Sequence, residues 1–306
     1  MNREEVIRGL IQNIFFFKKV KLTKTAIQKI LFKLRTELPV EHEVRTYLSY
    51  YWYNHGPFSE IVGSVIEEMK NTNNIVEEED RNGYSLLSLP FANQLNDSGI
   101  SDEVNLKLLE IVQSVNVYRL DSFVDRIYRD NAPYEFMPLY KLDFLKNLDD
   151  AVYHITTDSG SSQQMNHLEN VLFDCESALV EESLFKEYNQ KFSKFVTAMQ
   201  RSFDLMRDGE PCSKVLAYKI QEPAEEVWYT FAHGVRILDP AHDPYYNDKI
   251  PSWHIAFNTY YDNMVALVDV FSKTSLNYHL LAPNAPHPPD RKTRTILSSI
   301  VEGYLS

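Results

Sequence analysis

Glycine and long apolar runs are scarce in this sequence, and each shortage excludes a class of protein. Only 9 of the 306 residues are glycine, which disfavours barrels, sandwiches and nucleotide-binding folds with a glycine-rich loop. No apolar run approaches the roughly 18 residues that a transmembrane helix needs, so we expect no membrane association. Residues 1–8 contain Glu4 and Glu5 and lack the apolar core of a secretory signal.

Cysteine chemistry and the common catalytic motifs are also missing. Cys175 and Cys212 alone form neither a disulfide framework nor a metal knuckle, so we expect a protein of the reducing cytoplasm. The sequence has no phosphate-binding glycine loop, no Gly-x-Ser-x-Gly elbow, no Cys-x-x-Cys pair and no His-Glu-x-x-His helix. We therefore expect a protein that uses no cofactor and is not an enzyme.

Charge is present but unevenly spread along the chain. The formal net charge is -12, yet residues 1–36 are basic, with Glu4 and Glu5 as their only acids. A basic N-terminal segment in an otherwise acidic chain has three interpretations. It binds nucleic acid, it docks on an acidic surface, which can belong to the chain itself, or it is simply a solvated charged face. If DNA is bound, we expect its backbone to contact Lys18, Lys19, Lys21, Lys24, Lys29, Lys33 and Arg35.

The order of expected elements over residues 1–92 predicts a winged-helix domain. Apolar residues recur at helical spacing over 3–17 and 23–36, with Thr23 as the second N-cap. Residues 47–53 look extended, and Ser59 opens a helix that ends near Asn71. Asn82-Gly83 between two extended runs predicts a hairpin over 75–89.

The rest of the chain predicts a larger helical domain over 101–281, so the fold class is mainly α. The loose, polar stretch 91–100 is the expected domain boundary. Heptad-like spacing over 162–208 predicts a long helix, or a helical hairpin broken near Glu181-Glu182, with bundle packing favoured over a partner-facing seam. Further helices are expected at about 101–129, 141–155, 213–235 and 252–276.

The C-terminal residues predict a tethered docking helix. Residues 282–289 contain four prolines and read as a stiff linker. The helix expected at about 290–305 has one apolar face, formed by Ile296, Leu297, Ile300, Val301 and Leu305. Such a helix commonly docks elsewhere, in cis or on a partner.

Two groups of residues are candidate sites. The first contains possible ligands of zinc or manganese and possible acid–base groups, although their spacing matches no ligand signature: His233, Arg236, Asp239, His242, Asp243, His254 and Asp262. There, Asp239 and Asp243 can also be simple helix caps.

The second candidate site is the turn His55, Gly56, Pro57 and Ser59. His55 suits a phosphate or partner contact, while the other three suit a structural turn that sets the angle of the next helix.

Residues 25–32 and 52–59 carry a family resemblance. The Gln28-Lys29 helix, followed by the Gly56-Pro57 turn, resembles the phage-associated SocA-like, or Panacea, winged-helix group over about residues 20–90. The resemblance implies prokaryotic defence or mobile-element biology and a domain that works by binding. The winged helix followed by helices also resembles the middle subunits of defence systems that accompany an ATPase and an effector. The long helical extension departs from a simple antitoxin.

These observations favour a non-enzymatic adaptor or regulatory subunit of an anti-phage defence or toxin–antitoxin complex. Its partners would be an ATPase and an effector, or a toxin. The first alternative is a winged-helix transcriptional regulator. Its recognition helix and wing would be acidic and repel phosphate, through Glu60, Glu67, Glu68, Glu77, Glu78, Glu79 and Asp80. DNA contact would then be sequence-independent and use the N-terminal helices. The second alternative is a metal-dependent enzyme that uses the His/Asp group of residues 233–262.

Overall fold

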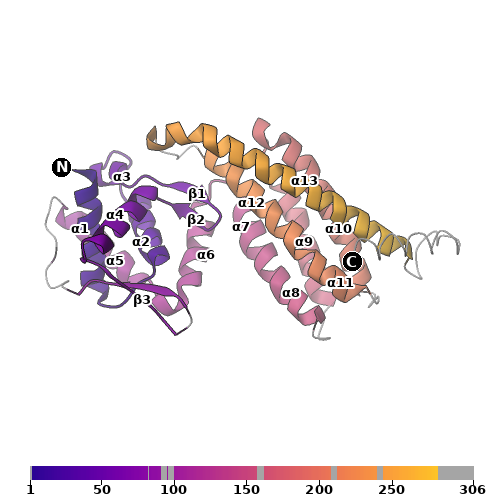
Figure 1. Cartoon of the computed structure of the whole chain (residues 1–306), viewed down its shortest axis with the longest axis horizontal. Coiled ribbons are helices and arrows are strands. Elements are labelled where there is room, and N and C mark those ends of the chain that lie inside the picture. The colour runs from indigo at the N-terminus through magenta and orange to yellow at the C-terminus, as the bar shows by residue number, and fades with distance from the viewer. Residues whose placement is uncertain are drawn as a thin grey trace. The chain divides into compact units, whose positions relative to one another are not determined.

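The chain folds into two compact units of mainly helical structure. The computed structural model describes residues 2–81, 83–90, 95, 100–156, 162–207, 212–239 and 244–281 (Figure 1). The first unit comprises Met1–Ala132 and Leu238–Ile250, and the second comprises Pro133–Ile237 and Pro251–Ser306. In the described part, β-structure is confined to two two-stranded sheets and one isolated bridge, all in the first unit.

The helices of the first unit begin where the sequence places their caps. The Thr23, Ser59 and Ser101 side chains each accept a hydrogen bond from the backbone N–H of the third residue of the following helix, and for Thr23 and Ser59 this confirms the predicted helix starts. The helical elements are α1 (Arg3–Lys18), α2 (Lys24–Glu37), α3 (Glu43–Tyr47), α4 (Glu60–Asn71), α5 (Asp102–Ser114), η1 (Val117–Arg119), α6 (Leu120–Asn131) and η4 (Pro244–Lys249).

Two hairpins complete this unit. The predicted hairpin forms from β3 (Val76–Glu79) and β4 (Ser85–Ser88), and an antiparallel bridge joins Leu22 to Leu87. β1 (Tyr51–Tyr53) pairs with β2 (Gly56–Phe58). Of the stretch expected to be extended at 47–53, only Tyr51–Tyr53 forms a strand. Tyr47 instead ends the short helix α3, which His42 caps by accepting the Val44 N–H at Nδ1.

The first unit extends beyond the predicted boundary at residues 91–100. α5 packs against both α1 and α2, with its apolar stripe buried. Within that interface, the Asn13 amide donates to Asn105 Oδ1 at 2.9 Å, so two buried polar groups satisfy each other. The single helix expected over 101–129 is interrupted at Val115, which turns to extended backbone; α6 then continues the unit to Ala132.

The second unit is a helical bundle. Residues 162–207 form a helical hairpin, the second of the two predicted alternatives, with α9 and α10 packed together and the break at residues 178–185. The expected helix 213–235 is divided at Ile220, because Pro223 lacks the N–H that would continue the ladder. The elements are α7 (Phe136–Pro138), η2 (Leu139–Leu145), α8 (Lys146–Thr156), α9 (Ser162–Ser177), η3 (Ser183–Phe185), α10 (Lys186–Arg207), α11 (Ser213–Lys219), α12 (Gln221–Leu238) and α13 (Ile250–Leu281).

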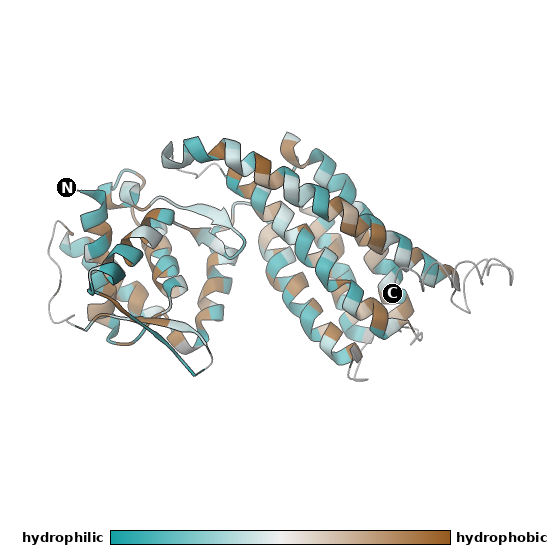
Figure 2. Cartoon of the chain, viewed as in Figure 1, coloured by the Kyte–Doolittle hydropathy of each residue, from teal (hydrophilic) through white to brown (hydrophobic). Residues whose placement is uncertain are grey.

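Aromatic rings fill the core of this bundle, as expected for the seam of residues 162–208. Phe231 lies 4.3 Å from Phe136 and 4.7 Å from Phe185 between ring centroids. The buried hydroxyls of Tyr140 and Tyr188 donate to backbone carbonyls of α12 at 2.9 and 3.1 Å. Figure 2 shows the hydrophobic and hydrophilic positions alternating along these helices. The seam therefore belongs to the core of the bundle, as the bundle-packing interpretation predicts.

No helix in the described ranges is long and apolar enough to cross a membrane. The linker 282–289 and the helix expected at 290–305 lie outside the described residues.

Candidate functional site

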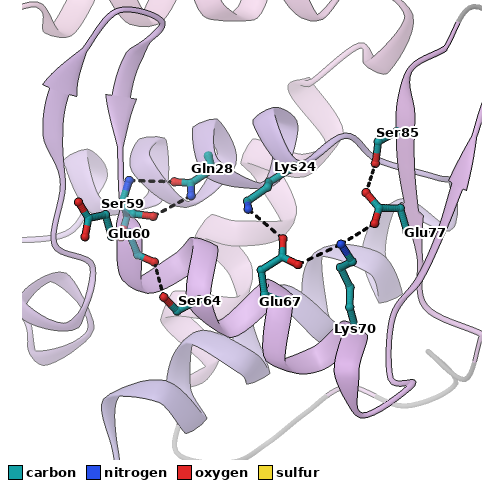
Figure 3. A network of polar contacts seen from close by, with 9 residues as sticks. All are labelled: Lys24, Gln28, Ser59, Glu60, Ser64, Glu67, Lys70, Glu77 and Ser85. Carbon is teal, nitrogen blue, oxygen red and sulfur yellow. Dashed lines mark hydrogen bonds and ion pairs between the residues drawn. The ribbon is translucent and has the colours of Figure 1, made fainter.

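The centre of α2 holds the start of α4 through one side-chain amide. Gln28 Nε2 donates to the Ser59 carbonyl at 2.8 Å, and the Ser59 N–H donates to Gln28 Oε1 at 3.1 Å (Figure 3). Both residues are buried. The amide offers one donor group and one acceptor, and here it satisfies both backbone groups of a single residue. The Ser59 side chain remains available to cap α4.

Lys29, the next residue of α2, holds the turn that precedes Ser59. Its Nζ donates to the carbonyl of His55 at 2.6 Å and to that of Pro57 at 2.8 Å. Only 3% of Lys29 is exposed, and burial lowers its pKa to about 7. Burial of a lysine side chain costs free energy, which its hydrogen bonds to the two carbonyls offset. Because these bonds form only when both carbonyls point at Nζ, Lys29 holds the turn at one position.

Gly56 is required where it stands in this turn. Its φ of +85° favours glycine, and an added Cβ would lie 3.1 Å from the Tyr128 ring and 3.2 Å from Lys29 Nζ. The Tyr128 hydroxyl donates to the Asn54 carbonyl at 3.3 Å, and the Tyr128 ring packs edge-on against Trp52. The turn therefore has the structural role expected of Gly56, Pro57 and Ser59. The His55 side chain is exposed beside it.

A line of alternating charges runs across the same face of the unit (Figure 3). Lys24 and Lys70 each pair with Glu67 at 3.0 Å, and Lys70 also pairs with Glu77 at 2.5 Å. The two lysines hold the pKa of Glu67 below its usual value, and Lys70 and Ser85 do the same for Glu77. Because both carboxylates are solvent-exposed and both lysines are partly exposed, each pair contributes little to stability. The network does, however, link α2, α4 and the β3–β4 hairpin.

The seven basic residues predicted for a DNA backbone are engaged within the unit to different degrees. Lys21 pairs with Glu78 and Lys33 with Glu37, while Lys24 and Lys29 have the partners given above. Lys18 Nζ donates to the Val112 and Val115 carbonyls at the end of α5, at 2.9 and 2.6 Å. Lys19 lies over the Phe16 ring, and Arg35 is half-buried near Tyr50. The expectation that basic residues dock on the chain's own acidic surface is confirmed for Lys21 and Lys24.

The first unit contains a buried tyrosine whose contacts the sequence did not predict. Tyr246, in the expected proline loop, is fully buried; its hydroxyl donates to the Ser49 carbonyl at 3.1 Å and accepts the Glu60 N–H at 3.3 Å. Its ring packs edge-on against Tyr51, and Lys249 pairs with Glu60. Two adjacent tyrosines in an otherwise polar loop were the signal that could have shown it.

The described members of the His/Asp group of residues 233–262 do not form a metal site. His233 is buried and stacks on Tyr260 at 4.0 Å, and burial, together with Arg236, lowers its pKa to about 3. Arg236 lies over the Trp253 ring. His254 and Asp262 are exposed on α13, Asp239 is buried in the first unit, and His242 and Asp243 lie outside the described residues. Among the residues that the structure describes, no three His, Cys, Asp or Glu side chains gather closely enough to hold a metal ion.

Comparisons with protein-family models, with curated proteins and with solved structures found no match to this chain.

Proposed function

We propose that this chain is a non-enzymatic adaptor or regulatory subunit that acts by binding other proteins. The complex would be of the kind found in prokaryotic anti-phage defence or toxin–antitoxin systems, with an ATPase and an effector, or a toxin, as partners. In this proposal the first unit is a winged helix. Support comes from the order α1, α2, α4 and β3–β4, and from the Leu22–Leu87 bridge that ties the hairpin back to the segment before α2.

The observation that carries the proposal is the internal pairing of the basic residues. Lys21 and Lys24 are bound to Glu78 and Glu67, and both carboxylates belong to the elements that a winged helix would present to DNA. Phosphate contacts dominate DNA affinity, and lysines already paired with carboxylates would have to leave them first. β3 is exposed at every position and carries Glu77, Glu78 and Glu79. Such a surface suits a protein partner better than a polyanion.

The linked turn supports the same proposal. Gln28 and Lys29 lie in one of the two segments that carry the family resemblance, and His55 and Ser59 lie in the other; four hydrogen bonds join them. The two segments that carry the resemblance are therefore the segments whose hydrogen bonds set the angle of α4. A rigidly held exposed helix is a suitable docking element, because little entropy is lost when a partner binds it.

Co-expression with the products of the neighbouring genes tests the proposal. The tagged chain should purify with at least one of them, and light scattering should give a mass above the 35.7 kDa of the chain. A charge reversal on the exposed face of α4, Glu68→Lys, should weaken the complex, whereas Glu103→Lys on α5 serves as a matched exposed control. Purification of the chain alone in every combination would contradict the adaptor proposal.

A further inference from the structure

A cavity of about 470 Å³ lies in the first unit, at the C-terminal end of α1. It is lined by Phe15, Phe16 and Lys19, by the following residues 20–21, and by residues 88–90 at the end of β4. We call this cavity the Lys19 pocket. Its volume falls within the roughly 300–1,000 Å³ of cavities that hold small organic ligands.

The Lys19 pocket lies where the pairing between two extended segments stops. Leu22 and Leu87 exchange two backbone hydrogen bonds, at 2.9 and 2.7 Å. In an antiparallel register, the next bonded pair on the side of the pocket would be Val20 and Leu89. Both residues belong to the described part of the chain, and no backbone hydrogen bond joins them. The two segments therefore separate beyond Leu22 and Leu87, and Val20 and Leu89 line the space between them.

Much of the lining is apolar. Phe15 is buried beneath the pocket, Phe16 and Leu89 are half-buried, and Val20 is 38% exposed. These four side chains come from α1, from the segment after it and from the end of β4. They offer a surface on which the apolar body of a ligand would be removed from water.

The charged groups of the lining are both cationic. Lys21 is paired with Glu78. The Lys19 ammonium lies 5.9 Å from the centroid of the Phe16 ring, and no carboxylate of the described residues pairs with it. Lys19 is therefore a cation at the edge of an apolar surface that is available to an anionic group.

The backbone of Lys19 gives an independent indication. Lys19 ends α1 with φ +54° and ψ +31°, and its N–H donates to the Phe15 carbonyl at 2.9 Å. This left-handed conformation disfavours residues with a Cβ, and helix ends commonly place glycine there. Lysine is thus a poor choice for the stability of the helix end, which favours a role for its side chain.

We propose that the Lys19 pocket binds a small organic carboxylate with an apolar body. The carboxylate pairs with Lys19, and the body covers Phe16, Val20 and Leu89. An inorganic anion would leave these apolar side chains uncovered, and a neutral apolar molecule would leave Lys19 without a counter-charge. The site goes beyond the proposed adaptor function, because it needs neither the face of α4 nor a protein partner.

Fluorescence titration of the full chain with anilinonaphthalene sulfonate (ANS) tests the proposal. N-phenylnaphthylamine has the same rings without the sulfonate. Lys19→Met should weaken ANS binding about fivefold, as expected for the loss of one partly exposed ion pair, and leave binding of the neutral probe unchanged. Arg126→Met is the matched control, because Arg126 also lies over a phenylalanine ring, Phe123 at 5.8 Å, but outside the pocket. Decanoate should displace ANS from the wild type.

Two further variants locate the probe and exclude unfolding as the cause. Lys19→Gly should lose ANS affinity as Lys19→Met does, yet unfold at the same or a higher temperature than the wild type, because glycine suits the positive φ. Val20→Glu should also weaken ANS binding, since it adds a carboxylate to the lining. Val40→Glu, at a 68% exposed position outside the pocket, should not.

Three results would overturn the proposal. The first is equal ANS affinity in the wild type, Lys19→Met and Val20→Glu, which would place the probe elsewhere. The second is an equal loss of ANS and N-phenylnaphthylamine binding in Lys19→Met, which would show that the charge of Lys19 has no part in recognition. The third is failure of decanoate to displace ANS.

Discussion

Gln28 and Ser59, thirty-one positions apart in the sequence, exchange two hydrogen bonds as if they were paired residues of a sheet. This relationship fixes the start of α4 against the middle of α2. Tyr50 strengthens it from the other side, because its hydroxyl donates to the Gln28 carbonyl at 2.8 Å. The position of α4 in the first unit therefore depends on a buried polar pair as well as on apolar packing.

Loss of the Gln28 amide should destabilise the first unit. Gln28→Ala leaves the Ser59 N–H and carbonyl buried without their partner, which costs about 2–4 kcal/mol of the free energy of unfolding. Urea denaturation measures this change. Gln113→Ala on α5 is the matched control, since Gln113 is exposed, and it should shift stability by less than about 0.5 kcal/mol. Equal effects of the two substitutions would rule out the structural role of Gln28.

The lowered pKa of Lys29 predicts that its contribution to the free energy of unfolding rises with pH. Its pKa is about 7 in the folded chain and about 10.4 in an unfolded one, so between these values the unfolded state binds the extra proton. The difference in unfolding free energy between wild type and Lys29→Met should therefore move in favour of the wild type by about 1 kcal/mol per pH unit from pH 7 to 9. Below pH 6 the difference should be constant. Urea denaturation across this range provides the test, and a flat difference would mean that Lys29 stays charged.

Alanine substitutions at Gly56 and Gly83 distinguish the stability cost of steric crowding from that of backbone strain. Both have a positive φ, +85° and +81°, but only Gly56 faces a packed ring and an ammonium group. Gly83→Ala should cost about 1 kcal/mol for the left-handed backbone alone. Gly56→Ala should cost about 1–3 kcal/mol more, because Tyr128 and Lys29 must shift. The comparison fails if thermal unfolding gives the same loss for both variants.

Tyr246 should stabilise the first unit although it lies far along the chain. Tyr246→Phe leaves the Ser49 carbonyl without this donor and the Glu60 N–H without this acceptor, which costs about 1–3 kcal/mol. Tyr246→Ala should cost about 3–5 kcal/mol, since it also empties a buried site. Tyr245→Phe is the control, because Tyr245 is 48% exposed. Unfolding of the first unit, followed by hydrogen exchange in α4, distinguishes these variants.

The sequence predicted the elements whose signals are local. Thr23, Ser59 and Ser101 mark helix starts by side-chain capping, and Asn82-Gly83 marks a hairpin; these signals need no knowledge of the rest of the fold. The break in the heptad spacing near Glu181 likewise marked the α9–α10 hairpin.

Features that depend on distant partners were not predicted. Nothing local shows that α5 covers α1 and α2, or that Tyr246 fills a site between Ser49 and Glu60. Lys21 and Lys24 looked available for phosphate, because the acids that bind them come from the β3–β4 hairpin and α4, more than 40 positions away. Ion pairs between distant elements cannot be predicted before the fold is known.

On the face formed by α2, α4 and the β3–β4 hairpin, Lys21, Lys24 and Lys70 are paired with the chain's own carboxylates, and we expect that this face does not bind DNA. Titration of a labelled duplex with the full chain at low salt tests it most directly, with Glu67→Gln/Glu77→Gln as the comparison, since this variant releases Lys24 and Lys70. We predict no binding of the wild type at protein concentrations up to about 100 µM, near the weak limit of non-specific DNA binding, and salt-sensitive binding of the variant. Binding of the wild type with a steep salt dependence, unchanged in the variant, would contradict the account.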